Sequence, residues 1–184
     1  LLNAGELCDS FVAPEYISFM ASQLRQANNE YSRGHRLLLL TKSADPGVLL
    51  NEDLSDVVVY SLSLNAERPA RDLEKGAPPP GSRLSAAVAL REAGYDVRVR
   101  VDPIITGYEE EYKVLIQHVS SRLEPSLITL GSLRATPRTY RFLPETIRAQ
   151  LTGRTPWGRG YSQQTRLSLY DGLCEAVRSH GVPV

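Results

Sequence analysis

Short runs of β-forming residues alternate along this chain with longer segments whose apolar residues recur at helical spacing. Such alternation is typical of parallel βα units, in which a helix returns the chain to the start of the next strand. Strands are predicted over residues 1–4, 35–41, 57–64, 97–101 and 127–130. Helices are predicted over residues 14–31, 84–93, 108–123 and 165–180. The pattern therefore predicts an α/β fold with a parallel sheet.

Two of the predicted strands differ in how many faces they bury. The segment 35–41 is almost uniformly apolar, which is typical of a strand covered on both faces. In the segment 97–101, valines alternate with arginines, and Asp102 continues the alternation. That period of two places the valines on a buried face and the charged side chains on the opposite face.

The alternation fades beyond Arg134. We therefore divide the chain into a βα region over residues 1–134 and a C-terminal extension over residues 135–184, which packs on the first region and closes with the last predicted helix. The run Pro78-Pro79-Pro80-Gly81 lies inside the βα region. We expect it to form a stiff loop that leads from a short helix into the helix at Leu84.

The charges are balanced overall but unevenly distributed. The chain has 21 basic and 21 acidic residues, so it lacks the overall positive field that marks many nucleic-acid-binding domains. Between Arg134 and Arg166, however, seven arginines accompany a single acid, Glu145. This stretch is the surface that we expect to face a polyanion; the alternative is an arginine-rich face that meets only solvent.

The sequence contains two cysteines, Cys8 and Cys174, too far apart to form a metal-spaced pair. Neither a zinc site nor a disulfide framework follows, and a reducing cytoplasm is the simplest compartment. No apolar run approaches the roughly 20 residues that cross a bilayer, and no signal peptide is visible, so we expect no membrane partner. The chain begins without an initiator methionine, and we expect it to start inside a longer natural sequence.

Polar residues follow every predicted strand, where parallel βα folds bind their ligands. Lys42 ends an apolar strand, so its ammonium must lie in a cleft, where it suits a ligand carboxylate, or beside an acid such as Asp9 or Asp45 at the rim. Ser63 and Asn65 are two residues apart and share one face of their strand, where they suit a ribose or an amino-acid group.

Each of the other candidate functional residues has two interpretations, one functional and one structural. Asp102 before Pro103 is a general base or ribose acceptor, or simply ends its strand. Cys8 is a reactive thiol or an inert small apolar residue. The segment 157–161 interleaves aromatic residues with an arginine, a mixture suited to bases and phosphates or to a packed surface turn. The three histidines are isolated from one another in the sequence and support no Ser-His-Asp or metal-histidine arrangement.

Six ordered segments together resemble the spore photoproduct lyase-like branch of the radical S-adenosylmethionine enzymes. They are Gly5-Glu6-Leu7-Cys8-Asp9-Ser10, Leu39-Leu40-Thr41-Lys42, Ser61-Leu62-Ser63-Leu64-Asn65, the block from Arg83 to Tyr95, Arg100-Val101-Asp102-Pro103-Ile104-Ile105, and Thr129-Leu130-Gly131-Ser132-Leu133-Arg134. The stretch from Gly158 to Tyr170 is also similar to the basic, tyrosine-containing segment that closes the family's sequences.

The resemblance implies a partial, TIM-like (β/α)6 barrel of the radical S-adenosylmethionine type. The first βα unit, with its cluster-binding CxxxCxxC loop, is expected upstream of Leu1, in a missing N-terminal segment or on a complementing chain. The implied cofactors are S-adenosylmethionine and a [4Fe-4S] cluster. The residues implied for the cofactor pocket and the reacting centre are Glu6, Cys8, Asp9, Lys42, Ser63, Asn65 and Asp102.

The family's chemistry begins with a 5′-deoxyadenosyl radical that abstracts a hydrogen atom from the substrate, and the lyase itself reverses a thymine photodimer in DNA. Here Glu6 falls where the lyase has its cysteine hydrogen donor, and Cys8 falls where it has a serine, which favours a relative with a different substrate. These two residues are the candidates for catalysis. Arg134, Arg159 and Tyr161 are the candidates for contact with DNA.

This chain has no cysteine triad, so we expect it to be inactive in radical chemistry by itself. The alternative function is a cluster-free barrel fragment that binds nucleotide or nucleic acid without catalysis. An unrelated βα enzyme that binds phosphates at its strand ends ranks last, because the sequence lacks a glycine-rich phosphate loop.

Overall fold

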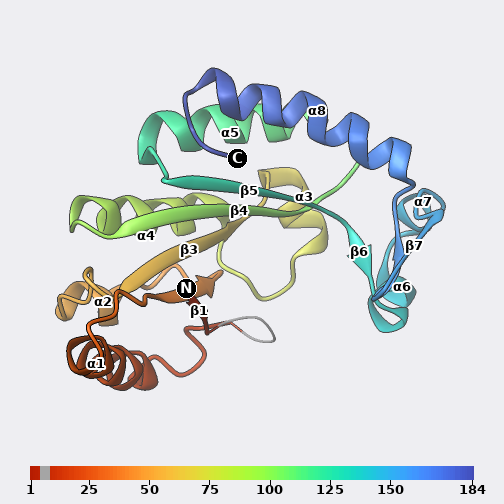
Figure 1. Ribbon diagram of the computed structural model, residues 1–184. Coiled ribbons are helices and arrows are strands. Elements are labelled where there is room, and N and C mark those ends of the chain that lie inside the picture. Colours follow the sequence, from red (N-terminus) through yellow and green to blue (C-terminus); the bar gives the residue numbers. More distant parts are fainter. Residues whose placement is uncertain (5–8) are drawn as a thin grey trace.

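The computed structural model describes residues 1–4 and 9–184 and contains a five-stranded, wholly parallel sheet. Its strands follow one another in chain order, so each helical connection steps to the neighbouring strand and the sheet curls into part of a barrel (Figure 1). The strands are β1 (Leu2–Asn3), β2 (Leu37–Thr41), β3 (Val58–Leu64), β4 (Asp96–Ile104) and β5 (Leu127–Ser132). All five predicted strands are confirmed, with β4 and β5 longer at their carboxyl ends.

Helices cover the outer side of this sheet (Figure 1). They are α1 (Glu15–Glu30), α2 (Gly47–Asn51), α3 (Glu67–Leu73), α4 (Pro80–Glu92), α5 (Glu109–Leu123) and α8 (Gln163–Ser179). The four predicted helices correspond to α1, α4, α5 and α8. Helix α4 begins earlier than predicted, inside the proline run, because a proline at the first helical position needs no hydrogen-bond partner for its nitrogen.

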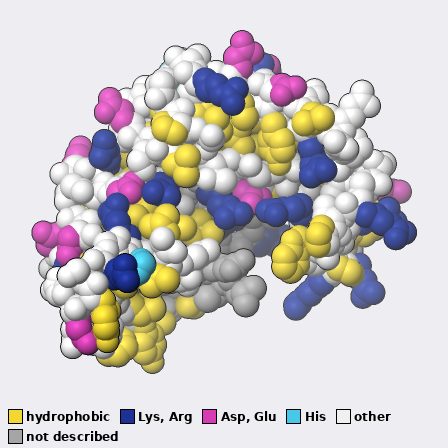
Figure 2. Space-filling model, viewed as in Figure 1, with side chains coloured by type: hydrophobic (Ala, Val, Ile, Leu, Met, Phe, Trp, Pro, Cys, Tyr) yellow, Lys and Arg dark blue, Asp and Glu magenta, His cyan; other side chains and the backbone are white. Residues whose placement is uncertain are grey.

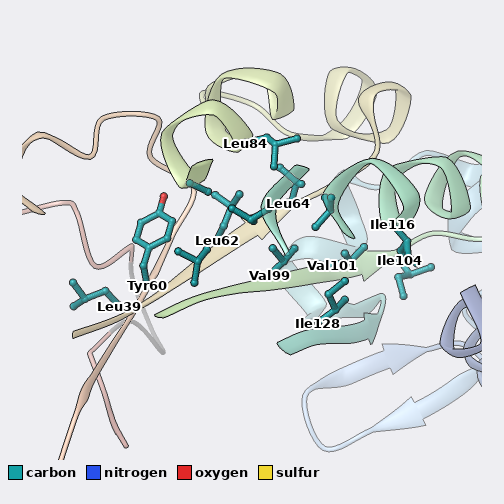
Figure 3. Close-up of a cluster of buried hydrophobic side chains, with 14 of the residues drawn as sticks. Leu39, Tyr60, Leu62, Leu64, Leu84, Val99, Val101, Ile104, Ile116 and Ile128 are labelled. Carbon is teal, nitrogen blue, oxygen red and sulfur yellow. The ribbon is translucent and has the colours of Figure 1, made fainter. Parts of the chain in front are cut away.

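The core lies between the sheet and these helices (Figure 3). Leu62 and Leu64 of β3 and Val99 of β4 point toward Leu84 of α4 and Ile116 of α5. The predicted alternation in β4 is confirmed, because its three valines are buried while Arg98, Arg100 and Asp102 are only partly covered. Burying apolar surface stabilises such a layer by about 25 cal/mol per Å².

Strand β2 differs from its prediction. Leu37, Leu39 and Thr41 are buried, but Leu38 and Leu40 on the opposite face stay partly exposed. The reason is that the helices cover only the outer face of the sheet, and the inner face of this open half-barrel is not covered in the same way (Figure 1). The apolar run therefore predicted the strand correctly, but the prediction that both of its faces are buried was wrong.

Residues 134–160 form a separate small unit, which we call the arm. It holds a three-stranded antiparallel sheet of β6 (Arg134–Ala135), β8 (Gly158–Gly160) and β7 (Gly153–Thr155), with the short helices α6 (Pro137–Phe142) and α7 (Glu145–Arg148). Gly158 has a φ of +142°, and a Cβ there would lie 2.3 Å from the carbonyl oxygen of Ala135, so the turn into β8 requires glycine. The arm projects from one end of the main sheet (Figure 1).

The chain returns from the arm to the main body through α8. Leu169, Leu173 and Val177 are buried in the core, and α8 packs along α5 (Figure 1). The backbone nitrogen of Ile128 in β5 also donates to the carbonyl oxygen of Pro183, 2.9 Å away. The C-terminal helix thus covers the last strand of the parallel sheet. No helix in residues 1–4 and 9–184 is long and apolar enough to cross a bilayer.

Candidate functional site

The carboxylate of Asp9 caps the end of β2. Its Oδ1 accepts hydrogen bonds from the Thr41 hydroxyl at 2.6 Å and from the backbone nitrogen of Phe11 at 2.9 Å. Its Oδ2 accepts from the backbone nitrogen of Lys42 at 2.7 Å. Three donors therefore fix this carboxylate against the strand end. The predicted catalytic residues Glu6 and Cys8 lie outside the described residues.

Lys42 reaches a partner that the sequence did not suggest. Its ammonium lies 2.8 Å from Oε1 of Glu74, which follows α3, and not beside Asp9 or Asp45 as the alternative interpretation expected. The other oxygen of Glu74 accepts from the guanidinium of Arg83, a side chain that is only 1% exposed. One largely buried carboxylate therefore pairs with two cations, Lys42 just after β2 and Arg83 of α4.

Arg83 fixes this group to the backbone as well. Its Nε donates to the carbonyl oxygen of Pro78 at 2.6 Å, and its Nη1 donates to that of Ser63 at 3.2 Å. Burial by itself raises the pKa of Glu74, but the hydrogen bonds and charges of Lys42 and Arg83 outweigh it and hold the pKa below its usual value. Glu74 is therefore a charged carboxylate at neutral pH.

A signal for this cluster exists in the sequence. Arg83 stands four and seven residues before Ala87 and Leu90, on the face of α4 that faces the sheet. A charge on an apolar helix face needs an acidic partner, because an unpaired buried ion is strongly unfavourable. The pattern does not say which acid is chosen, since Glu74 is brought there by the fold.

Asn65 also meets Glu74, at the end of β3. Its amide nitrogen lies 3.4 Å from Oε1 of Glu74, and its oxygen accepts from the hydroxyl of Tyr112 at 2.8 Å and from the nitrogen of Ala66 at 3.0 Å. The side chain is 1% exposed. Asp9, Lys42 and Asn65 thus meet at one rim of the sheet. The amide of Asn65 forms its hydrogen bonds with other residues of the protein.

Ser63 does not share a face with Asn65, contrary to the prediction, because β3 ends at Leu64 and Asn65 lies beyond the strand, where it bonds Tyr112 of α5. In the parallel register Ser63 pairs with Arg100 of β4, and paired residues point to the same side of a sheet. That side is the inner face, because Leu62 and Leu64 point to the helices (Figure 3). The carbonyl of Ser63 joins the rim cluster through Arg83, whereas its side chain belongs with Arg100 and Asp102 inside the half-barrel.

Asp102 on this inner face is flanked by two arginines. Its Oδ2 accepts from Nη2 of Arg100 at 2.9 Å and from Nη2 of Arg134 at 3.1 Å. The carboxylate lies directly over β5, where a Cβ on Gly131 would come within 2.5 Å of its Cγ. Two positive charges against one negative charge leave this group cationic. Such a group suits a ligand anion better than it suits a general base.

The arm continues the positive surface away from the sheet. A hollow of about 740 Å³ is lined by Tyr140 and Trp157 together with Arg141, Arg154 and Arg159. Trp157 is 67% exposed. None of these three arginines forms an ion pair within residues 1–4 and 9–184. Figure 2 shows Lys and Arg side chains across the middle of one face and over the arm.

Tyr161, predicted to contact DNA, is buried and does not lie on this surface. It is 2% exposed, and its hydroxyl accepts from the backbone nitrogen of Thr106 at 3.1 Å. Burial raises the pKa of Tyr161 above its usual value. The ring is therefore part of the core beside the arm, and Trp157 is the aromatic side chain that faces outward.

The residues present do not fit an iron–sulfur cluster. Cys174 is the one described cysteine, and no group of three His, Cys, Asp or Glu side chains with metal-binding geometry occurs in the part of the chain that the structure describes. The whole sequence has two cysteines, fewer than the three thiolates that a CxxxCxxC motif supplies.

The curled parallel sheet, with polar side chains at the carboxyl ends of its strands, defines a partial (β/α) barrel. Solved structures of spore photoproduct lyase share this fold. A mutant with bound AdoMet and dinucleoside spore photoproduct is 21% identical with a TM-score of 0.77, and the match covers 97% of this chain and 57% of that one. The lyase complexed with dinucleoside spore photoproduct is 24% identical with a TM-score of 0.66, covering 79% and 48%.

No family model and no curated protein sequence matches the chain. The similarity to the solved structures establishes the fold, and it confirms the predicted partial TIM-like (β/α) barrel. This chain spans about half the length of those lyases.

Proposed function

We propose that this chain is the C-terminal portion of a radical S-adenosylmethionine enzyme that resembles spore photoproduct lyase and acts on a nucleic-acid substrate. The observation that carries the proposal is the shared half-barrel fold together with polar side chains at the ends of β2, β3 and β4. In such folds the strand ends hold the ligand, because the sheet fixes their positions. The mutant lyase structure with bound AdoMet has this fold.

The proposed S-adenosylmethionine site uses Asp9 and Lys42 at the rim and Ser63 and Asp102 on the inner face. A ligand carboxylate would compete with Glu74 for the ammonium of Lys42, whose side chain is 35% exposed. Asn65 would not contact the ligand; its hydrogen bonds would hold Glu74 and the end of β3 in place. Bound S-adenosylmethionine supplies the radical chemistry of such enzymes; the residues of this chain bind and orient it.

Calorimetric titration with S-adenosylmethionine tests this site. Lys42→Ala should weaken binding by about 10-fold or more, because hydrogen bonds to charged groups contribute roughly 1.5–3 kcal/mol. Lys75→Ala is the matched control, since Lys75 is an exposed lysine beside Glu74 with no ion pair among the described residues. Equal titrations for the two variants would remove Lys42 from the site.

The cluster ligands must come from outside this chain, in an N-terminal segment or a complementing chain. The experiment is anaerobic reconstitution of the natural full-length product with iron and sulfide, followed by reductant and S-adenosylmethionine. We expect a brown protein that releases 5′-deoxyadenosine. A colourless protein that releases none would reject the enzymatic proposal, including its hydrogen-abstraction and lyase-like steps.

Contact with DNA is proposed for Arg134 and Arg159. Arg134 is the first residue of the arm and its side chain reaches Asp102 on the inner face, and Arg159 lines the arm hollow beside Trp157. Arginines pair with phosphates, while an exposed indole stacks on bases. A nucleic-acid strand that follows these side chains would run from the arm to the inner face.

The second candidate function is a cluster-free half-barrel that binds nucleotide or nucleic acid without catalysis. The observation that favours it is the distribution of charge: Lys42 is already neutralised by Glu74, while Arg141, Arg154 and Arg159 of the arm have no acidic partner among the described residues. A full-length product that binds a DNA oligonucleotide but neither iron nor S-adenosylmethionine would favour this function over the enzyme.

A further inference from the structure

A groove on the outer side of the molecule lies apart from the candidate site. It runs along α5 and is closed on the other side by the start of α3 and α4. The rim cluster and the arm take no part in its lining, apart from the adjoining end of β3. Its volume of about 360 Å³ is at the small end of the range of about 300–1,000 Å³ seen for binding pockets.

The floor and walls of this groove are apolar. Leu64 and Leu84 form part of the buried floor, as their position between the sheet and α4 shows (Figure 3). Val114 stands on the α5 wall and is 64% exposed, with Leu115 beside it. Gly81 opens the opposite wall, because a Cβ there would meet only a Glu67 oxygen at 3.9 Å. The groove therefore offers an apolar surface with charged side chains at its ends.

The two ends of the groove carry opposite charges that lack partners. At the end near the start of α5, Glu110 pairs with Lys113 and Glu111 with Arg68, which leaves Glu67 unpaired within the described ranges. At the other end are the side chains of His118 and Arg122, which also have no hydrogen-bond or ion-pair partner among residues 1–4 and 9–184.

These charges determine what kind of segment fits. From Glu111 to Arg122 the α5 axis rises about 16 Å, which is three turns of helix. A helix of that length presents apolar side chains at i, i+4 and i+7 to a groove of this shape. Helices favour acids at their N-terminus and bases at their C-terminus. The matching orientation therefore places the N-terminus of the occupant at Arg122 and its C-terminus at Glu67.

We propose that this groove binds an amphipathic helix of a partner protein, antiparallel to α5, with an acidic N-terminal end and a basic C-terminal end. The bound helix would bury Val114 and Leu115 and pair its terminal charges with Arg122 and Glu67. The surface is independent of the proposed cofactor and nucleic-acid sites, so a partner there would attach the protein to an assembly without covering its rim.

The test uses two fluorescent peptides of about 14 residues, long enough for marginal helicity. Both have leucines at i, i+4, i+7 and i+11; one has glutamates first and lysines last, and the other has these charges exchanged. Fluorescence anisotropy should show that the first peptide binds the protein about tenfold more tightly than the second. Equal affinity for the two peptides, or binding of neither, would overturn the proposal.

Variants locate the binding. Val114→Glu should abolish it, whereas Leu167→Glu, at a leucine of α8 that is 54% exposed, should not. The double variant Glu67→Lys with Arg122→Glu should exchange the peptide preference. Thermal melting shows whether each variant is folded, and the charge swap keeps the test valid if Val114→Glu is not.

Other occupants give different results. Self-association of the unmodified protein in sedimentation, lost in Val114→Glu, would assign the groove to a second copy and overturn the proposal. Binding of 1-anilinonaphthalene-8-sulfonate at this site without discrimination between the peptides would assign it to small apolar molecules and overturn it as well.

Discussion

Basic side chains at the rim, where β2 and β3 end, are buried or paired with an acid. Basic side chains of the arm hollow are exposed and, among the described residues, unpaired. At the rim, the cations of Lys42 and Arg83 share the buried carboxylate of Glu74. In the arm, Arg154 and Arg159 are exposed and have no ion pair in the described part of the chain. Buried charges must be paired, while exposed charges exchange partners at little cost. The rim charges therefore hold the fold, and the arm charges remain available to a ligand.

The largest expected effect comes from Arg83→Met. The substitution leaves Glu74 buried with one cation instead of two, and removing one partner of a buried pair costs about 3–5 kcal/mol. Urea unfolding measures it. Arg159→Met in the arm is the control and should change the free energy of unfolding by less than about 0.5 kcal/mol. Similar losses for the two variants would end the distinction between rim and arm.

Gly131→Ala tests the place where the main sheet meets the arm. The new Cβ would lie within 2.5 Å of the Asp102 carboxyl carbon and would push that carboxylate away from Arg134. Overpacking of this kind costs about 1–3 kcal/mol. Gly172→Ala in α8 meets nothing within 4 Å and should instead stabilise the protein by about 0.5–1 kcal/mol. Thermal or urea unfolding of both variants gives the comparison, and a neutral Gly131→Ala would contradict the close approach.

Acid should weaken the rim through the carboxylate of Glu74. Because the pKa of Glu74 in the folded protein lies below its unfolded value near 4.3, its contribution to stability is complete above about pH 4.3 and is lost as the pH falls through the folded pKa. The stability of the unmodified protein should therefore fall more steeply below about pH 4.3 than that of Glu74→Gln. Parallel pH profiles would show that Glu74 is not held ionised by its two cations.

The smallest effect is expected for a single arm contact. Arg159→Ala should weaken binding of a DNA oligonucleotide a few-fold and reduce the slope of log affinity against log salt by about 1, because one phosphate contact is lost. Arg178→Ala, an exposed arginine of α8 outside the arm, is the control. If both variants keep the salt dependence of the unmodified protein, the arm does not bind the phosphate backbone.

Much of the main sheet could be predicted because its signals are local. The alternating valines of 97–101 require one buried face, and Gly94 ends α4 in a left-handed conformation that suits glycine. The arm gave no such signal. Its strands are two or three residues long and contain glycine and arginine, so neither period nor β-propensity marks them. They exist because β6, β7 and β8 pair with one another.

The candidate site divides in the same way. The sequence by itself determined the βα order and the positions of Lys42, Ser63 and Asn65 at the strand ends, since periodicity and chain order set both. Only the tertiary structure decided that Glu74 pairs with Lys42, that Ser63 lies beside Arg100, and that Tyr161 is buried while Trp157 is exposed. The reason is physical: a local pattern sets which residues form a strand or helix, but the partner of a charge depends on which distant segments the packed core brings within a few ångströms.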